Sequence, residues 1–225
     1  MQRNQFVKTV RRSINLNDLP TINSLPIKNK LGNITNRATL IKQFVHEANA
    51  VKCHTHLVND HEIAMDTILN LLSDQPNKKY MSWDDKWLPI PNFNTILKNL
   101  KYEHCNNYIP QDREKRQSTY KHLEQACIGI TGCSAGLADT GSIILESQAG
   151  QGRLCSLLVP IHVALITSNQ IYPTMGSYLS DKSDNVTRSS NCNIITGPSR
   201  TSDITQTLTL GIHGPGTLHI VIIDN

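Results

Sequence analysis

The first 126 residues alternate between segments whose apolar residues have helical spacing and segments with the spacing of β-strands. Leu40, Phe44 and Ala48, for example, recur every four positions, which places them on one face of a helix. The same reading predicts helices from Leu40 to Ala48, from Ile63 to Leu72 with Asn59 or Asp60 as the cap, from Pro91 to Leu100 and from Glu114 to Ala126, and strands at Val51 to Val58, Lys79 to Trp83 and Cys127 to Ile130. This alternation favours a largely parallel sheet with helices on both faces.

The pattern changes after Gly132. Strands are predicted near 142–146, 155–166, 192–196 and 218–223, joined by turns, with short helices only near 168–180 and 201–208 and an exposed loop from 180 to 193. We therefore expect an α/β fold with a mostly parallel sheet, flanking helices and a partly mixed C-terminal half.

The first 36 residues differ from the rest. Residues 3–14 have the spacing of a short amphipathic helix, and residues 15–36, with two prolines, one glycine and six asparagines, are typical of a linker. The expected organisation is an N-terminal helix and linker arm at 1–36, followed by one α/β domain at 37–225.

Glycines concentrate in the second half, where eleven of the twelve follow residue 126. They form short clusters between apolar, β-branched stretches, and glycine lets the backbone turn with positive φ or approach a ligand closely. Strands that end repeatedly in such loops predict a shared pocket at one sheet edge.

The segment from Thr196 to Asp203 gives the clearest candidate site. A strand is expected to end at Thr196, and the following Gly197, Ser199, Arg200 and Thr201 would lie at a turn before a helix. Free N–H groups, the positive helix end and a guanidinium can together hold a carboxylate or phosphate. The alternative is a well-capped helix in which Arg200 pairs with Asp203 or another acid.

A second candidate is the turn formed by Asp139, Thr140, Gly141 and Ser142. Asp139 could act as nucleophile, general base or hydroxyl acceptor, or it could simply form an Asx turn with the N–H of Gly141.

For three further features, the sequence allows either a role in ligand binding or catalysis or a purely structural role. Arg153 could hold a phosphate, or residues 150–153 could be a tight hairpin between strands 142–146 and 154–159. His213, flanked by glycines, is a better catalytic candidate than His162, which reads as a core histidine. The run from Cys53 to His56 has no acidic or thiol partner at metal-ligand spacing, so no metal is predicted.

The charge distribution and the cysteines argue against several classes of protein. Residues 127–225 hold only four Lys and Arg against six Asp and Glu, which suits one small anionic ligand and argues against nucleic acid. Six cysteines form no C-x-x-C pair, the N-terminus lacks an apolar signal region, and the longest near-apolar run, 157–166, is about half of a membrane span. We expect a reduced, cytoplasmic protein without a membrane span.

The motifs of the second half, read in order, resemble those of the LUD (lactate utilisation) domain family, in particular its lactate utilisation C group. The matching stretches are Gly129-Ile-Thr-Gly-Cys133, Ala138-Asp-Thr-Gly-Ser-Ile-Ile-Leu145, Gly152-Arg-Leu154, Val159-Pro-Ile-His-Val-Ala164, Ile195-Thr-Gly-Pro-Ser-Arg-Thr-Ser-Asp-Ile204 and Leu210-Gly-Ile-His-Gly-Pro-Gly-Thr-Leu-His219. The family often has Glu before Thr-Gly, whereas this chain has Asp139.

The resemblance implies the fold of ribose-5-phosphate isomerase, glucosamine-6-phosphate deaminase and CoA transferases. It also implies a role beside iron–sulfur partner proteins in oxidising L-lactate to pyruvate, with the clusters in those partners and no cofactor in this chain. A second hypothesis is a stand-alone enzyme acting on a sugar phosphate, CoA ester or folate-like anion, because fold alone cannot decide function. Whether the chain is itself an enzyme, and whether it forms a homodimer, stays open.

Overall fold

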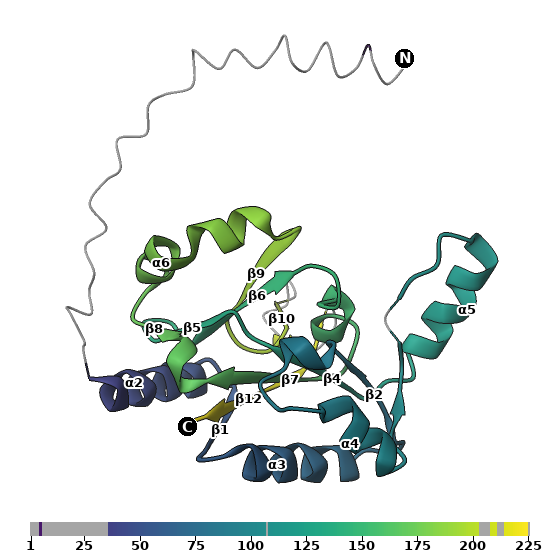
Figure 1. Cartoon of the computed structure of the whole chain (residues 1–225), viewed down its shortest axis with the longest axis horizontal. Coiled ribbons are helices and arrows are strands. Elements are labelled where there is room, and N and C mark those ends of the chain that lie inside the picture. Colours follow the sequence, from purple (N-terminus) through teal and green to yellow (C-terminus); the bar gives the residue numbers. More distant parts are fainter. Residues whose placement is uncertain (1–4, 6–35, 107, 203–207, 211–213, 225) are drawn as a thin grey trace. The chain divides into compact units, whose positions relative to one another are not determined.

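A six-stranded, fully parallel sheet forms the centre of the described structure (Figure 1). This computed structural model describes residues 5, 36–106, 108–202, 208–210 and 214–224. The strand order is β1 (His54–Val58), β12 (Thr217–Ile223), β7 (Ile161–Thr167), β4 (Ile128–Gly132), β2 (Lys79–Ser82) and β3 (Glu103–His104). Since all strands run the same way, their carboxyl ends meet at one edge of the sheet.

Helices connect these strands as the apolar spacing predicts. They are α2 (Arg37–Ala50), α3 (His61–Ser73), the 3₁₀ turn η2 (Asp85–Trp87), α4 (Phe93–Asn99) and α5 (Arg113–Leu123). Asp60 caps α3, because its carboxylate accepts a hydrogen bond from the Ile63 backbone N–H at 2.8 Å. In Figure 1, α3 and α4 lie below the sheet.

A second, four-stranded sheet lies on the other side of the parallel one in this view (Figure 1). Its order is β8 (Ile171–Tyr172), β5 (Ala135–Leu137), β6 (Ser142–Ser147) and β9 (Asn191–Ile195). Helix α6 (Met175–Arg188) lies beside it, and the same half of the chain contains the 3₁₀ turns η3 (Arg153–Ser156) and η4 (Ser168–Gln170). β5 pairs parallel to β8 and antiparallel to β6, which is itself antiparallel to β9. This mixed sheet confirms the expectation for the C-terminal half.

The core consists of the parallel strands and the helix faces that cover them. Ile128, Ile130, Val163 and Ile220 are completely buried. Strands that are covered on both faces show continuous apolar runs rather than alternation, which is why these segments were readable in the sequence. His162 is also buried there and shares a 2.9 Å hydrogen bond with Thr131 Oγ1, so it is a core histidine as predicted.

Three local predictions were wrong. Residues 153–156 form a 3₁₀ turn instead of a strand, and β6 pairs with β5 and β9, so residues 150–153 are not a hairpin to a strand at 154–159. Helix α6 occupies much of the predicted loop at 180–193. Each of these outcomes depends on tertiary contacts that periodicity does not contain.

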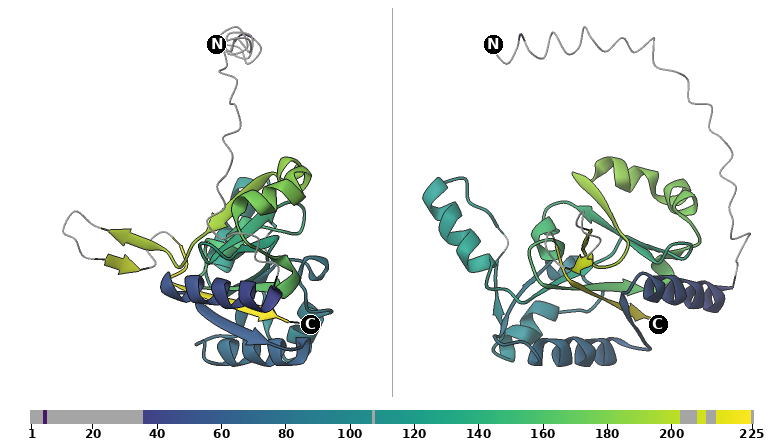
Figure 2. Two further views of the ribbon diagram at one scale, coloured as in Figure 1. Left: turned by 90° about the vertical axis from the view of Figure 1, so that its left-hand side faces the viewer. Right: turned by 180° about the vertical axis from the view of Figure 1, so that it is seen from behind.

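The predicted helix at 201–208 is the third error. Arg200–Ser202 is strand β10, which pairs antiparallel with β11 (Leu208–Leu210). Both strands extend away from the two sheets (Figure 2, left). The threonines at 201 and 209, which face each other in the register, are residues that favour strands.

The described residues from 36 onward belong to one compact unit. The predicted helix at 3–14 and linker at 15–36 lie outside the described residues, apart from Gln5. Among the helices of the described part, none is long and apolar enough to cross a membrane.

Candidate functional site

A cavity of about 850 Å³ lies at the carboxyl edge of the parallel sheet. Its floor comes from the ends of β4 and β7, including Cys133 and Thr167, and its other walls come from the segment after β2, from β6 and from α6. Ligands of α/β proteins bind at this edge because loops, rather than regular backbone pairing, shape it. The cavity is therefore the candidate site.

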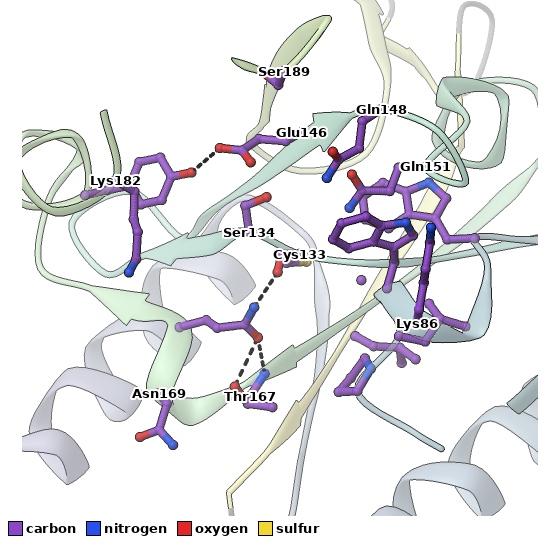
Figure 3. Close-up of a pocket in the computed structure, with 18 of the residues that line it drawn as sticks. Lys86, Cys133, Ser134, Glu146, Gln148, Gln151, Thr167, Asn169, Lys182 and Ser189 are labelled. Carbon is purple, nitrogen blue, oxygen red and sulfur yellow. Dashed lines mark hydrogen bonds between the residues drawn. The ribbon is translucent and has the colours of Figure 1, made fainter. Parts of the chain in front are cut away.

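Glu146 brings a carboxylate into this cavity from β6 (Figure 3). Its side chain is buried, with 7% of the residue exposed, and it accepts a 2.5 Å hydrogen bond from the Tyr178 hydroxyl. Burial and then this hydrogen bond raise the pKa of Tyr178 above its usual value, so the phenol keeps its proton. Within the described part of the chain, no Lys, Arg or His lies close enough to form an ion pair with Glu146.

Gln151 adds a second buried polar group. Only 6% of the residue is exposed, and its Oε1 accepts no hydrogen bond from the residues that the structure describes. The loop carrying Gln151 is fixed by two indole N–H groups, since Trp83 donates to Gly152 O and Trp87 donates to Ala149 O, both at 3.1 Å. Gln151 is thus held in place with an acceptor that a ligand could use.

Three cationic side chains border the cavity. Lys86, Lys182 and Arg188 all contribute to its lining, and Figure 3 shows Lys86 and Lys182 on opposite sides of it. Lys182 Nζ lies 3.3 Å from Asp181 Oδ2, whereas the described residues provide no acidic partner within 4 Å for the other two. The rim can therefore attract an anionic group.

The floor of the cavity is rigidly connected. Gln170 Nε2 donates to Cys133 O at 2.6 Å, and Gln170 Oε1 accepts from the Thr167 N–H at 2.8 Å. Burial raises the pKa of the Cys133 thiol, which favours its protonated form.

The glycine-loop residues predicted as a site gather elsewhere, around the end of α2. Thr140 Oγ1 and Ser142 Oγ lie 2.7 Å apart, and Ser142 Oγ lies 2.8 Å from Thr196 Oγ1, which links two loops that are distant in sequence. Gly141 has φ of +65°, and a Cβ there would overlap the backbone of Ala48. Gly197 likewise packs against Val51 with positive φ.

Arg200 belongs to the same region. Its guanidinium is exposed and donates to Val51 O at 2.5 Å, just after the end of α2. The helix N-terminus expected beside it is absent because residue 200 begins strand β10. Ser199 N–H donates to Pro215 O at 2.8 Å, so two of the glycine loops do meet.

The remaining predicted residues are spread out. Asp139 and Arg153 are exposed, and Thr201 is described only as backbone paired with Thr209. His213 lies outside the described residues. As far as they are described, the predicted site residues do not line the cavity at the carboxyl edge.

Sequence reasoning missed the cavity residues Trp83, Trp87 and Glu146, whereas Gln151 belongs to the loop at 150–153 that was considered as a phosphate-binding loop or a hairpin. One signal was available, because Trp83 and Trp87 are the chain's two tryptophans and stand four positions apart. Glu146 was read only as the end of a strand, since nothing in the sequence shows which face a strand residue presents.

Histidines gather on β1 and β12. His56 Nε2 lies 3.0 Å from His219 Nδ1, and the His54 ring stacks on His219 at 4.9 Å between centroids. Burial, followed by the proximity of His56 and His54, lowers the pKa of His219 to about 4. Among the described residues, no group of three or more His, Cys, Asp or Glu has an arrangement that could hold a metal ion.

Comparison with known proteins places the chain in a family. Proteins named lactate utilization protein C are similar to the chain: one from Geobacillus sp. (strain WCH70) is 28% identical over 185 residues, covering 79% of this chain and 76% of that protein. One from Macrococcus caseolyticus (strain JCSC5402) is 27% identical over 190 residues, covering 81% and 74%. One from Bacillus subtilis (strain 168) is 34% identical over 119 residues, covering 51% and 49%.

A crystal structure of a DUF162 family protein from Deinococcus radiodurans superimposes with a TM-score of 0.61 at 20% sequence identity. The match covers 84% of this chain and 98% of the other, which shows a shared fold. The sequence pattern that defines the LUD domain matches residues 41–223, from α2 to the last strand of the parallel sheet. The chain belongs to the LUD domain family.

Proposed function

We propose that this protein takes part in lactate utilisation and that the cavity at the carboxyl edge is its ligand site. The similar proteins from Geobacillus and Macrococcus bear the name lactate utilization protein C. The observation that carries the site assignment is the cavity itself, which is lined both by the buried polar groups Glu146 and Gln151 and by the cations Lys86 and Arg188. Such a rim suits the carboxylate of a small organic acid.

The finer part of the proposal concerns partners and reaction. We propose that the chain works in the cytoplasm beside iron–sulfur proteins that oxidise L-lactate to pyruvate, and that these partners supply the electron-transfer clusters. The support is the motif resemblance of the second half. Oxidation of lactate to pyruvate releases two electrons and two protons, so the electrons need an acceptor, and this chain has no iron–sulfur cysteine spacing in its sequence.

The glycine-loop residues remain a second part of the proposal. Asp139 and His213 are the proposed catalytic groups, with Thr140, Gly141, Ser142, Arg153, Gly197, Ser199, Arg200 and Thr201 as proposed anion-binding positions. The hydrogen-bonded contact between Ser142 and Thr196 and the contact between Ser199 and Pro215 support a common location for most of these loops.

Growth tests this function directly. Deleting the gene should prevent growth on L-lactate and leave growth on pyruvate unchanged, because only the oxidation step is lost. The wild-type gene should restore growth, whereas a gene with Lys86→Gln and Arg188→Gln should restore it poorly. A tagged full-length chain purified from lactate-grown cells should bring down proteins with iron–sulfur absorption. Normal growth of the deletion strain on L-lactate would rule the role out.

A further inference from the structure

The cavity is much larger than lactate requires. Lactate has only six non-hydrogen atoms, whereas cavities of roughly 300–1,000 Å³ are typical of sites for drug-sized or cofactor-sized molecules. At about 850 Å³, this cavity lies in the upper part of that range. Given the proposed function, on which this inference rests, the molecule that fills the site is larger than the organic acid itself.

The buried polar groups of the cavity are hydrogen-bond acceptors. Glu146 uses Oε1 for Tyr178 and has no cation beside it among the described residues, and Gln151 Oε1 is buried without a donor from them. Leaving the Gln151 acceptor unsatisfied is unfavourable, by about 1–3 kcal/mol. A ligand that presents N–H groups would satisfy it and would add donors to Glu146, whose Oε1 already accepts from Tyr178.

The aromatic walls favour a flat ligand. Trp83 and Trp87 both line the cavity, and both of their N–H groups are already bonded to backbone carbonyls of the loop at 149–152. Trp83 is only 2% exposed, so the half-buried Trp87 offers the ring surface of this wall, and ring surfaces pack best against other planar groups. Lys86 Nζ lies 5.3 Å from the centre of the Trp87 ring, which places a cation next to this aromatic wall.

The rim adds a requirement for negative charge. Lys86 and Arg188 border the cavity without an acidic partner within 4 Å in the described structure, and Lys182 is paired with Asp181. An anionic group on the ligand would lie near these cations while its ring lies deeper, toward Glu146 and Gln151.

We propose that the cavity binds a planar nitrogen heterocycle that has a ring N–H beside an exocyclic amino group and carries an anionic tail. A carboxylate can accept both N–H groups of such an edge at once, so Glu146 is the principal recognition residue. Gln151 accepts a further N–H, Trp87 covers the ring, and the rim cations hold the tail.

Calorimetric titration of the full chain with guanosine 5′-monophosphate tests this ligand class. Inosine 5′-monophosphate lacks the exocyclic amino group, guanosine lacks the anionic tail, and ribose 5-phosphate lacks the ring. We expect guanosine 5′-monophosphate to bind, and each analogue to bind at least about tenfold more weakly, which is the effect of losing about 1.4 kcal/mol. No binding of guanosine 5′-monophosphate, or equal binding of ribose 5-phosphate, would overturn the proposal.

Variants locate the binding. Glu146→Gln and Gln151→Leu should each weaken guanosine 5′-monophosphate binding at least tenfold, and the exposed control Glu124→Gln should not change it. Lys86→Gln should weaken the contact with the phosphate of the ligand, and the matched control Lys121→Gln should not change binding. Because Lys86→Gln leaves the buried groups intact, it still tests the site if Gln151→Leu does not fold. Unchanged guanosine 5′-monophosphate binding in Glu146→Gln would contradict the role of Glu146 as the principal recognition residue.

The two proposals can fail separately. Growth of the deletion strain on L-lactate tests the role in lactate utilisation and does not depend on which molecule fills the cavity. Titration with the four probes tests the ligand class and does not depend on growth.

Discussion

Tyr178 on α6 donates a 2.5 Å hydrogen bond to Glu146 on β6, and both side chains are almost completely buried beside the cavity. The bond joins a helix to a sheet strand 32 positions earlier in the sequence. Because Glu146 has no cationic partner among the described residues, this phenol is the group that stabilises its buried carboxylate.

Removing the phenol should therefore destabilise the protein. We expect Tyr178→Phe to lower the free energy of unfolding by about 2 kcal/mol, because a buried acceptor loses its donor. Urea denaturation measures this change. In the double variant with Glu146→Gln, the two effects should be strongly non-additive. Additive effects would show that the two side chains do not depend on each other.

Gly141 should tolerate no side chain. Its φ is +65° and an added Cβ would meet the backbone of Glu47 and Ala48, so Gly141→Ala should cost more than about 1 kcal/mol. In a protein of this size that corresponds to a decrease in Tm of at least about 2–4 °C. The matched control is Gly214→Ala, whose Cβ would have only ordinary contacts with Ser199. Equal Tm values for the two variants would contradict the packing described for α2.

Acid should destabilise the fold through His162. Burial lowers the pKa of His162 to about 3, while an unfolded histidine titrates near 6.5. Between these values the unfolded state binds more protons, so stability is retained above pH 6.5 and is lost as the pH falls toward 3. His162→Gln should reduce the slope of unfolding free energy against pH by up to about 1.4 kcal/mol per pH unit in this window.

Chemical denaturation at a series of pH values measures that slope. The exposed His46→Gln is the matched control, since its side chain is 76% exposed. A variant at 162 with the wild-type slope would mean that this histidine also becomes protonated in the folded state.

Arg200 should matter more for anion binding than for stability. Its guanidinium is exposed and, among the described residues, bonds to Val51 O, so Arg200→Ala should cost less than about 1.5 kcal/mol of unfolding free energy. Under the proposal for the glycine loops, the same change should weaken binding of an anionic ligand there, and Arg200→Lys should weaken it less. Thermal melting and titration with lactate and pyruvate, done in parallel, separate the two effects. A large loss of stability would mark Arg200 as structural.

The segment from residue 36 onward should fold by itself. Helix α2 begins at Arg37 and is capped by Asn36, whose side chain accepts from the Thr39 N–H at 3.3 Å. A chain of residues 36–225 should unfold cooperatively with a Tm within about 4 °C of the full chain, the equivalent of about 1 kcal/mol. Non-cooperative melting would show that the predicted arm is part of the domain.

The sequence determined the local elements of this protein. Helical spacing located α2, α3 and α4, and the position of Asp60 located a helix cap, because these features depend on neighbours three or four residues apart. Continuous apolar runs revealed the central strands β4, β7 and β12, since burial on both faces removes polar positions, whereas β1 was predicted from alternation and the two-residue β3 was not predicted. The buried state of His162 followed from the same run.

Only the tertiary structure decided how these elements combine. β12, the last strand, lies between β1 and β7, and β9 pairs with β6. The spacing of apolar residues within a segment does not show which distant segment it pairs with. The cavity could not be predicted for the same reason. It forms only when the two sheets pack together and bring together the tryptophans after β2, Glu146 on β6 and Tyr178 on α6. The glycine loops were visible because glycine has a local backbone signature, whereas a buried carboxylate acquires its role from residues far away in the chain.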